Sequence, residues 1–405
     1  MTDWKEDTIS ECISINPKRE LKKNSVAKYV SMADITANQK SVTYYVERKF
    51  YGGSKFQNGD TLLARISPCL ENGKTAYVDF LKNGEIAWGS TEFIVLSGKD
   101  GKSINEFVYY LAKSSALRNV AIRSMSGTSG RQRVQEQLLA NEKIAIPPLI
   151  EQRSIVKLLS DLDAKIELNH QMNKTIEETA QAIFKHWFVD FEFPDESDKP
   201  YKSNGGKLVD SEFGKIPVGW KSENLDKIAD YLNGLALQKF PPTGDNDLPV
   251  IKIRELRQGT VDGSDMANNK LRIEYVIDDG DVLFSWSGSL EIRIWCGGRG
   301  ALNQHLFKVT SKKYPKWFFL YWTLFYLPSF QKIAEGKATT MGHIQRHHLT
   351  GATVALPPEA LIQKADKILT PLIETFIINS VESRKLGSTR DSLLPRIMSG
   401  TIRVT

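Results

Sequence analysis

The chain repeats itself once, and this repeat constrains its fold more than any other feature of the sequence. Shifted by 210 residues, the C-terminal part aligns without a gap with the segment from Ser129 to Phe188. Coinciding positions include Val134 and Ile344, Leu139 and Leu349, Pro147-Pro148 and Pro357-Pro358, Leu159 and Leu369, Leu162 and Leu372, and Asn169 and Asn379. Agreement at one constant offset indicates two copies of one structural unit.

Segments upstream of this region also correspond, but at offsets that change along the chain. The matching pairs are Trp4 and Trp220, residues 59–63 (GDTLL) and 280–284 (GDVLF), and residues 90–96 (STEFIVL) and 303–309 (NQHLFKV). Each copy therefore has a front of variable length and a back of fixed length. A fixed length suits a helix whose register matters, and a variable front suits loops carried on a scaffold.

The back of each copy is predicted to be one long helix. Pro147 and Pro148 suit a helix start, where a missing N–H costs nothing. Residues then recur at alternating intervals of three and four, as in the a/d stripe of a coiled coil. The stripe comprises Ile155, Leu159, Leu162, Ile166, Asn169, Asn173, Ile176, Ala180, Ile183 and Trp187 in the first copy, and Ala365, Leu369, Leu372, Phe376, Asn379, Ser383, Leu386, Arg390, Leu393 and Ile397 in the second. A helix of about 40 residues is roughly 60 Å long.

Two such stripes in one chain most simply pair with each other, with Asn169 and Asn379 fixing the register. The alternative is that each stripe packs only on its own domain. Pro371 occupies the position that Asp161 has in the first copy, and a proline inside a helix removes a hydrogen bond. We therefore expect the second helix to bend or break near Thr370.

The fronts, residues 1–147 and 217–356, are predicted to be α/β recognition domains, which gives an α+β fold class. The expected strands include Val42–Val46, Thr61–Leu63, Phe93–Leu96 and Lys143–Ile146, and the expected helices are Ile104–Lys113 and Pro315–Tyr326. Residues 148–191 form the first spacer helix, and residues 357–400 form the second with the C-terminal tail. The polar segment 192–216 is rich in Gly and Ser and forms a linker.

Polar loops that follow the small helices carry candidate binding residues. Cations, hydroxyls and amides bind phosphate oxygens and base edges, with Arg favouring guanine and Gln favouring adenine. The candidates are Thr128, Ser129, Arg131, Gln132 and Arg133 in the first copy, and Thr339, Thr340, His343, Gln345 and Arg346 in the second. Further candidates on expected strands are Arg65, Ser67, Ser285 and Ser287, together with Lys252 and Arg254, which would share one strand face. The alternative for each is a solvated surface side chain.

Composition is compatible with a polyanionic partner but does not require one. The 405 residues carry a net charge of +6, which also fits an ordinary soluble protein. Cys12, Cys69 and Cys296 show no CxxC spacing, so neither a disulfide framework nor a zinc site is expected. The sequence shows no N-terminal apolar segment and no long apolar run, and we expect a soluble cytoplasmic protein without membrane contact.

Sequence motifs for catalysis and metal binding are absent. We find no P-loop, no [ND]PP[FY] motif of adenine methyltransferases and no GxSxG. His343, His347 and His348 have a spacing that could bind zinc on a helix, but HExxH is missing and the first copy has no histidine there. The chain is therefore predicted to be a non-catalytic binding scaffold without a metal site.

Local motifs make the whole chain similar to the specificity subunit of type I restriction–modification systems. The motifs are residues 146–152 (IPPLIEQ) at the first helix start, 180–191 (AQAIFKHWFVDF) at its end, 216–220 (IPVGW) at the opening of a recognition domain, and 393–400 (LLPRIMSG) in the tail. Two departures stand out. Pro358 is followed by EALIQ rather than LxEQ, and no Pro-x-Gly precedes Trp4.

The resemblance implies two target-recognition domains joined by helices that pack as an antiparallel coiled coil with pseudo-twofold symmetry. The helices act as a spacer, and each domain reads one half of a bipartite target on double-stranded DNA. Two methyltransferase subunits would bind S-adenosylmethionine and methylate a flipped-out adenine. Restriction and translocase subunits would add cleavage that depends on ATP and Mg. This chain itself would bind no cofactor.

Two other classes of function stay open on the residues alone. A scaffold that binds no nucleic acid would lack salt-dependent DNA binding, because phosphate contacts release counterions. An enzyme with an unrecognised site would be active without any partner. A specificity chain that serves a methylation-only system is a variant within the same family.

Overall fold

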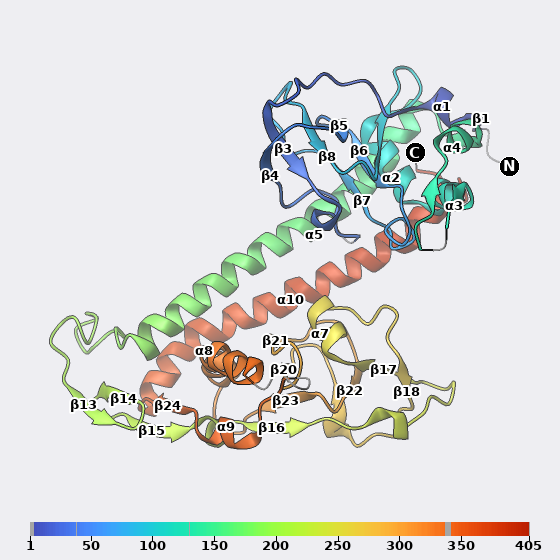
Figure 1. Ribbon diagram of the computed structural model, residues 1–405. Helices are drawn as coiled ribbons and strands as arrows, with labels where there is room; N and C mark the ends of the chain where they lie inside the picture. Colours follow the sequence, from blue (N-terminus) through green and yellow to red (C-terminus); the bar gives the residue numbers. More distant parts are fainter. Residues whose placement is uncertain (1–3, 38, 129, 337–341, 405) are drawn as a thin grey trace. The chain divides into compact units, whose positions relative to one another are not determined.

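The computed structural model describes residues 4–37, 39–128, 130–336 and 342–404. The chain divides into two compact units. Unit 1 comprises Met1–Lys165 and Leu386–Thr405, and unit 2 comprises Ile166–Lys385. Two long helices, α5 (Leu149–Phe184) and α10 (Glu359–Met398), contribute residues to both units (Figure 1).

Unit 1 is built on two four-stranded sheets. Its elements are β1 (Lys5–Thr8), α1 (Ile9–Cys12), β2 (Ile13–Ile15), β3 (Val26–Val30), β4 (Val46–Lys49), β5 (Ser54–Phe56), β6 (Thr61–Ala64), β7 (Thr75–Tyr77), β8 (Ala87–Gly89), β9 (Phe93–Gly98), α2 (Asn105–Lys113), α3 (Ser115–Arg123), β10 (Met125–Ser126), β11 (Arg133–Val134), α4 (Glu136–Asn141) and β12 (Lys143–Ile146). The sheet orders are β2-β9-β6-β7 and β4-β3-β8-β5, with β3 parallel to β8. Strands β1 and β12 form a separate antiparallel pair.

Unit 2 repeats this topology, which confirms that the chain contains two copies of one fold. Its elements are β13 (Leu208–Ser211), β14 (Gly214–Pro217), β15 (Lys221–Asn224), α6 (Leu225–Ile228), β16 (Asp230–Asn233), β17 (Leu248–Ile251), α7 (Ile253–Gln258), β18 (Met266–Ala267), β19 (Val276–Ile277), β20 (Val282–Ser285), β21 (Ile292–Ile294), β22 (Gly300–Leu302), β23 (Leu306–Thr310), α8 (Lys316–Glu335), α9 (Arg346–Thr350) and β24 (Thr353–Leu356). The sheets β16-β23-β20-β21 and β18-β17-β22-β19 correspond to those of unit 1, and β15 pairs with β24 as β1 pairs with β12.

The alternation of side chains along each central strand explains the layers. In β6, Leu62 faces the core between the two sheets, and Leu63 faces the core that α2 and α5 cover. Strand β20 does the same, because Leu283 lies in the inter-sheet core and Phe284 lies in the core beneath α8. A strand that is apolar on both faces is buried from both sides.

Helices α5 and α10 pair in antiparallel orientation. Within unit 2, Asn169 Nδ2 donates to Glu382 Oε2 at 2.8 Å, Asn173 Nδ2 donates to Ser380 Oγ at 2.8 Å, and Asn379 Nδ2 donates to Asn173 Oδ1 at 3.0 Å. Asn169 Nδ2 also lies 3.4 Å from the carbonyl of Asn379, its counterpart in the repeat. These contacts, one of them between equivalent residues, confirm the predicted pairing of the two helices within unit 2.

Every stripe residue predicted for the two helices is buried or half-buried. In unit 1, Arg390 Nη1 donates to Asp163 Oδ1 at 2.7 Å, and the Tyr110 hydroxyl donates to Asp163 Oδ2 at 2.7 Å. The 210-residue shift relates Asp163 to Ile373 and Arg390 to Ala180, and both of these lie in the apolar core of unit 2. The two ends of the helix pair therefore use different chemistry at equivalent positions.

The expected break near Thr370 is wrong, because α10 continues from Glu359 to Met398 through Pro371. Pro371 and Lys367, four residues earlier, are both exposed. The carbonyl that loses its N–H partner at a proline therefore lies on the solvent side, where water can satisfy it. Helix α5 ends differently, with a π-helical turn over Lys185–Val189.

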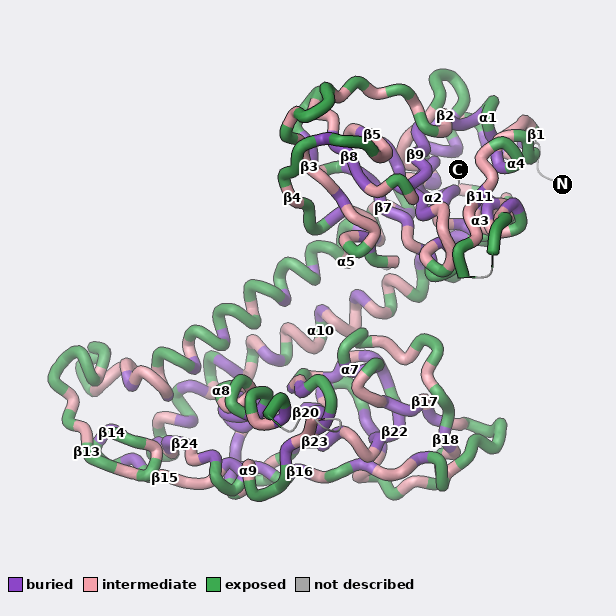
Figure 2. Tube along the Cα trace, viewed as in Figure 1, coloured by how far each residue is buried: buried purple, intermediate pink, exposed green. Residues whose placement is uncertain are grey.

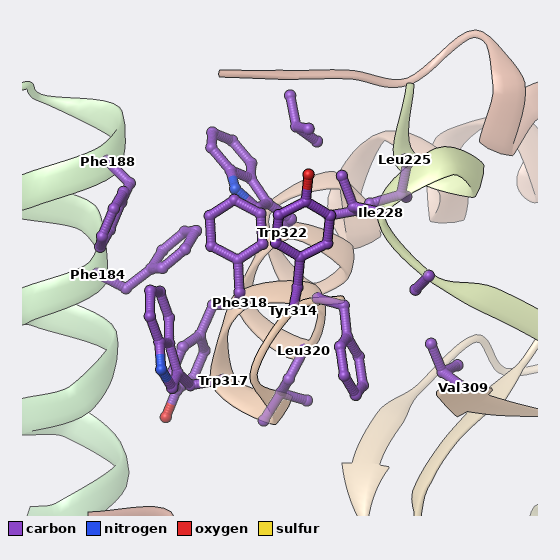
Figure 3. Packing of buried hydrophobic residues seen from close by; sticks show 14 of the residues in the cluster. Phe184, Phe188, Leu225, Ile228, Val309, Tyr314, Trp317, Phe318, Leu320 and Trp322 are labelled. Atoms are coloured by element: carbon purple, nitrogen blue, oxygen red, sulfur yellow. The ribbon is translucent and has the colours of Figure 1, made fainter. Parts of the chain in front are cut away.

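Aromatic side chains dominate the core between α5 and α8 in unit 2. Phe184 at the end of α5 and Phe188 in the π-helical turn that follows point toward Trp317, Phe318 and Trp322 of α8 (Figure 3). The ring centroids of Phe184 and Trp322 are 5.2 Å apart, and those of Phe188 and Trp317 are also 5.2 Å apart. Helix α8 is longer than the expected 315–326, because it continues through Pro328 to Glu335.

Two local predictions are wrong. Residues 42–45 are not a strand, and β4 begins only at Val46, because Val42 alone turns into the core while Tyr44 is exposed. The segment 250–256 (VIKIREL) is not one strand either, because β17 ends at Ile251 and α7 begins at Ile253. The Glu255 carboxylate accepts the Lys252 backbone N–H at 3.1 Å and so caps the new helix.

The segment 192–216 is more ordered than a polar linker suggests. It contains most of the hairpin formed by β13 and β14. Phe193 is buried and stacks on Trp220, with ring centroids 5.3 Å apart, and on Tyr201 at 4.7 Å. Over the part of the chain that the structure describes, no helix combines the length and apolarity needed to cross a bilayer.

Candidate nucleic-acid interface

In unit 1, two loops that carry predicted binding residues are hydrogen-bonded to each other. The first follows β6, and the second is the hairpin of β10 and β11. Ser67 N donates to the Gln132 carbonyl at 2.9 Å, and Val134 N donates to the Arg65 carbonyl at 2.9 Å. A third segment joins them, since Arg65 N donates to the Glu92 carbonyl at 2.9 Å.

Unit 2 repeats this arrangement bond for bond. Gly288 N donates to the Gly342 carbonyl at 2.8 Å, and Ile344 N donates to the Trp286 carbonyl at 3.0 Å. Trp286 N lies 3.3 Å from the His305 carbonyl, as Arg65 N pairs with Glu92. The repeat therefore preserves a backbone frame, defined here as residues 65–67, 92 and 132–134 in unit 1 and 286–288, 305 and 342–344 in unit 2. The side chains on this frame differ between the copies.

The hairpin tip in unit 1 presents its polar side chains outward. Gly127 and Gly130 have φ of 124° and 77°, a backbone region that glycine adopts without steric cost. Thr128 and Arg131 are exposed, and Gln132 is half-buried. No partner for the Arg131 guanidinium lies within the described residues. A free guanidinium beside an amide can donate to phosphate oxygens or to a base edge.

Two other predicted cations of unit 1 are bound to carboxylates. Arg133 makes a bidentate contact with Glu92, with Nη2 to Oε1 at 2.7 Å and Nε to Oε2 at 3.0 Å. This hydrogen-bonded carboxylate raises the pKa of the Arg133 guanidinium. Arg65 Nη1 lies 2.8 Å from Glu136 Oε1. Both arginines hold the frame together rather than extending freely from it.

Two predicted serines in unit 2 are buried, one at the end of β20 and one in the turn that follows. Ser285 is fully buried, and its hydroxyl donates to the Ser289 carbonyl at 2.7 Å and accepts the Glu291 N–H at 2.7 Å. Ser287 is also buried, and its hydroxyl lies 2.9 Å from His305 Nδ1. As placed, these hydroxyls shape the turn and are not available to a ligand.

The indole of Trp286 and the imidazole of His305 occupy the frame of unit 2, and neither was predicted. Trp286 Nε1 donates to Asn233 Oδ1 at 2.9 Å, and its ring lies 5.8 Å from that of His305 and 6.3 Å from that of His343. His305 matches Glu92 in the alignment of residues 303–309 with 90–96. That alignment identifies His305 as a frame residue, and extending the match of 280–284 with 59–63 by two residues relates Trp286 to Arg65.

The remaining predicted residues of unit 2 lie at the start of α9 or in the β17 region. Gln345 and Arg346 are both exposed. Arg346 also donates through Nη2 to the Tyr231 carbonyl at 3.1 Å. Lys252 pairs with Asp265, and Arg254 Nη2 donates to the Gly263 carbonyl at 2.6 Å. Lys252 and Arg254 therefore do not share one face of a strand. Ser129, Thr339 and Thr340 lie outside the described residues.

A family comparison identifies the chain. The model for the type I restriction modification DNA specificity domain matches residues 1–178 and again residues 217–386, one match for each copy of the repeat. The chain belongs to the type I restriction–modification DNA specificity family. Its members supply DNA specificity without catalysis, which confirms the prediction that this chain is not an enzyme.

Known specificity subunits resemble the chain along most of its length. The type I restriction enzyme MjaIX specificity subunit of Methanocaldococcus jannaschii is 27% identical over 315 residues, covering 76% of this chain and 71% of the relative. The HindI specificity subunit of Haemophilus influenzae is 23% identical over 470 residues, covering 99% and 100%. A type I S subunit structure from M. genitalium, at 14% identity, superposes with a TM-score of 0.57 over 97% of this chain and 96% of its own. That structure supports the fold.

Proposed function

We propose that this specificity chain reads a bipartite double-stranded DNA target with a fixed gap, each unit reading one half through its backbone frame. The observation that carries the proposal is the repeated frame itself. Equivalent backbone hydrogen bonds hold it in both units, while the side chains on it differ. A constant backbone scaffold with different polar side chains on its loops suits two domains that recognise two different sequences.

The residues at the two frames divide into contact and support. Thr128 and Arg131 in unit 1 and Gln345 in unit 2 are exposed and, with the half-buried Gln132, would contact bases or phosphates. The buried or paired members of each frame fix where those tips lie. Base contacts of Arg and Gln are bidentate and contribute about 1–3 kcal/mol of discrimination each. Phosphate contacts would position the chain without selecting sequence.

The gap in the target would follow from the length of the helix pair. The helices keep their registry through the asparagine contacts. Recognition modules on one face of a duplex are spaced by about one helical turn, ~34 Å, or multiples of it. A helix pair of fixed length would hold the unread segment of the target constant.

Two methyltransferase subunits would bind the helices. Leu158 and Leu168 on α5 and Ile368 and Ile378 on α10 are exposed apolar side chains, and the 210-residue shift relates the two pairs. Apolar residues exposed at equivalent positions fit one partner bound twice in equivalent orientations. These subunits would bring S-adenosylmethionine to an adenine, and restriction subunits, where present, would add cleavage that depends on ATP and Mg.

Methyl transfer from purified subunits tests this function. The methyltransferase encoded beside this chain is incubated with duplex DNA and labelled S-adenosylmethionine, with and without the chain. We expect label in DNA only when the chain is present, and much less with a Leu158→Glu/Ile368→Glu variant. Exposed Lys174→Glu/Lys385→Glu serves as a matched helix variant that should retain transfer. Equal label without the chain would refute the proposal.

A further inference from the structure

The outer face of one sheet in unit 1 carries a cluster of aromatic rings with two cations beside them. Tyr29 of β3 and Trp88 of β8 have ring centroids 4.5 Å apart, and Phe50 lies 5.4 Å from Trp88. The Arg48 guanidinium lies 4.8 Å from the Tyr29 ring, and Lys55 Nζ lies 5.9 Å from the Phe50 ring. We call these five residues the aromatic–cationic face.

Strand register explains how these side chains come together. Tyr29 is the direct partner of Trp88, and Trp88 is the direct partner of Lys55, so all three project to one side of the sheet. Ala27 pairs with Arg48 two positions along, which places Arg48 on the same side. The opposite side turns Val30, Phe56 and Ala87 into the inter-sheet core. No position of these four strands on the outer side is acidic.

The equivalent face in unit 2 is apolar and covered. The sheet order and the parallel pair relate Tyr29 to Val250, Trp88 to Ala301 and Lys55 to Val276. All three unit 2 residues are buried, in a core that Leu237 and Phe240 of the preceding segment help to form. In the aromatic–cationic face of unit 1, Arg48 is exposed and Tyr29 and Lys55 are half-buried, while Trp88 and Phe50 are buried. Figure 2 shows β4 of unit 1 mostly exposed and β22 of unit 2 buried. One copy of the repeat thus carries two cations on a face that is apolar and buried in the other copy.

Among the residues that the structure describes, the aromatic–cationic face carries two unpaired cations and a buried indole N–H that has no acceptor. No carboxylate within the described residues pairs with Arg48 or Lys55. Trp88 is only 7% exposed, yet its indole N–H has no hydrogen-bond partner in the described structure. A buried donor without an acceptor is costly. Arg48 and Lys55 give this face two cations without a carboxylate partner in the described part of the chain, and such cations are complementary to the anionic oxygens of phosphate groups.

We infer that the aromatic–cationic face binds the phosphodiester backbone of duplex DNA beside the bases that unit 1 reads. The inference rests on the proposed function. Continuity with the frame supports the location, because β8 leads directly through Ser90 to Glu92, which holds Arg133 of the hairpin. Unit 2 has no such face, so backbone contacts of this kind belong to one half of the target only.

Salt-dependent DNA binding tests the inference. The complex of this chain with its methyltransferase subunits is titrated onto a duplex that carries the target and onto a scrambled duplex, from 50 to 200 mM salt. The variant is Arg48→Ala/Lys55→Ala. The slope of log affinity against log salt should become shallower by about 1.8, since each lost phosphate contact contributes about 0.9. Affinity for both duplexes should fall by the same factor, with the methylated sequence unchanged.

Two controls separate charge from packing. Arg48→Lys/Lys55→Arg should keep the wild-type slope, and Lys215→Ala/Lys221→Ala, which removes two exposed cations of unit 2, should also keep it. An unchanged slope in Arg48→Ala/Lys55→Ala would overturn the inference. So would weaker binding of the methyltransferase subunits with normal DNA binding, which would assign the face to a protein partner. Loss of all chain-dependent methylation in the wild-type complex would instead refute the proposed function.

Discussion

The buried ion pair between Asp163 and Arg390 predicts a large and specific loss of stability in unit 1. Both side chains are nearly inaccessible, with 7% and 8% of their surface exposed. Replacing Arg390 by Met leaves the Asp163 carboxylate buried with only the Tyr110 hydroxyl as donor. Removing one member of a buried pair costs about 3–5 kcal/mol, because the other charge stays desolvated. We expect Arg390→Met to lose stability in that range.

The repeat supplies a rescue variant. At the equivalent positions of unit 2, the chain uses Ile373 and Ala180. Asp163→Ile/Arg390→Ala copies these residues into unit 1, and Tyr110→Phe removes the hydroxyl that would lose its acceptor. Because buried pairs replaced by apolar residues are often close to neutral, the triple variant should lie within about 2 kcal/mol of the wild type.

The assay must report unit 1 separately, because a chain with two units need not unfold in one step. Hydrogen exchange in increasing urea, read from peptides of α2 and residues 149–165, gives the local opening free energy. Arg384→Met in unit 2 is the matched control and is read from peptides of unit 2. Its partner Asp279 is 2.6 Å away but both side chains are about one third exposed, and such pairs contribute about 0–1 kcal/mol. A loss of stability below about 1 kcal/mol in Arg390→Met, or equal losses in the single and triple variants, would show that the buried charge of Asp163 does not depend on Arg390.

Three further predictions concern the frame, the helices and a buried lysine. Arg131→Ala should reduce discrimination against single-base changes in one half of the target by about 1–3 kcal/mol of binding free energy and leave discrimination in the other half unchanged. Arg133→Ala should instead lower the stability of unit 1, because Glu92 loses its partner. Loss of discrimination in both halves by Arg131→Ala would exclude the hairpin tip as the part that contacts the bases. One heptad inserted into both α5 and α10 lengthens the helix pair by about 10 Å. This insertion should widen the gap in the methylated sequence or abolish assembly, and an unchanged gap would contradict the spacer role of the helices. Burial, followed by the charge of Arg390, lowers the pKa of Lys113 to about 8. Between about pH 8 and 10 the unfolded state therefore binds more protons than the folded state, and the contribution of Lys113 to stability rises with pH. Lys113→Met should lack that rise, and parallel stability profiles of variant and wild type against pH would disprove the prediction.

The repeat made the fold predictable, because apolar positions at a constant offset report a buried face directly. Leu159 and Leu369, or Asn169 and Asn379, mark the helix seam in the sequence, and the structure places all four in it. The strand expected at 42–46 was wrong for the opposite reason. Its β-branched and aromatic residues satisfy strand propensity, but Tyr44 and Tyr45 are exposed, and Tyr45 stacks on Phe80 with ring centroids 5.0 Å apart. Propensity is a weak guide where packing decides.

The recognition frame was only partly predictable. The sequence indicates which loops are polar, but not which polar groups satisfy each other. Arg131 and Arg133 are indistinguishable by type, and only the position of Glu92, 41 residues away, separates the free guanidinium from the paired one. Ser285 looked available on an expected strand, yet the turn after β20 folds back onto its hydroxyl. Partners distant in sequence decide such cases.

Mapping of methylated adenines across host DNA is the decisive experiment for the proposed DNA specificity. The methyltransferase encoded beside this chain is expressed with and without the chain in a strain that lacks both, and modified positions are read by sequencing. We expect one split motif, with two short specific parts and a gap of constant length, present only with this chain. A continuous motif, a gap that varies between sites, or the same modification without the chain would contradict this expectation.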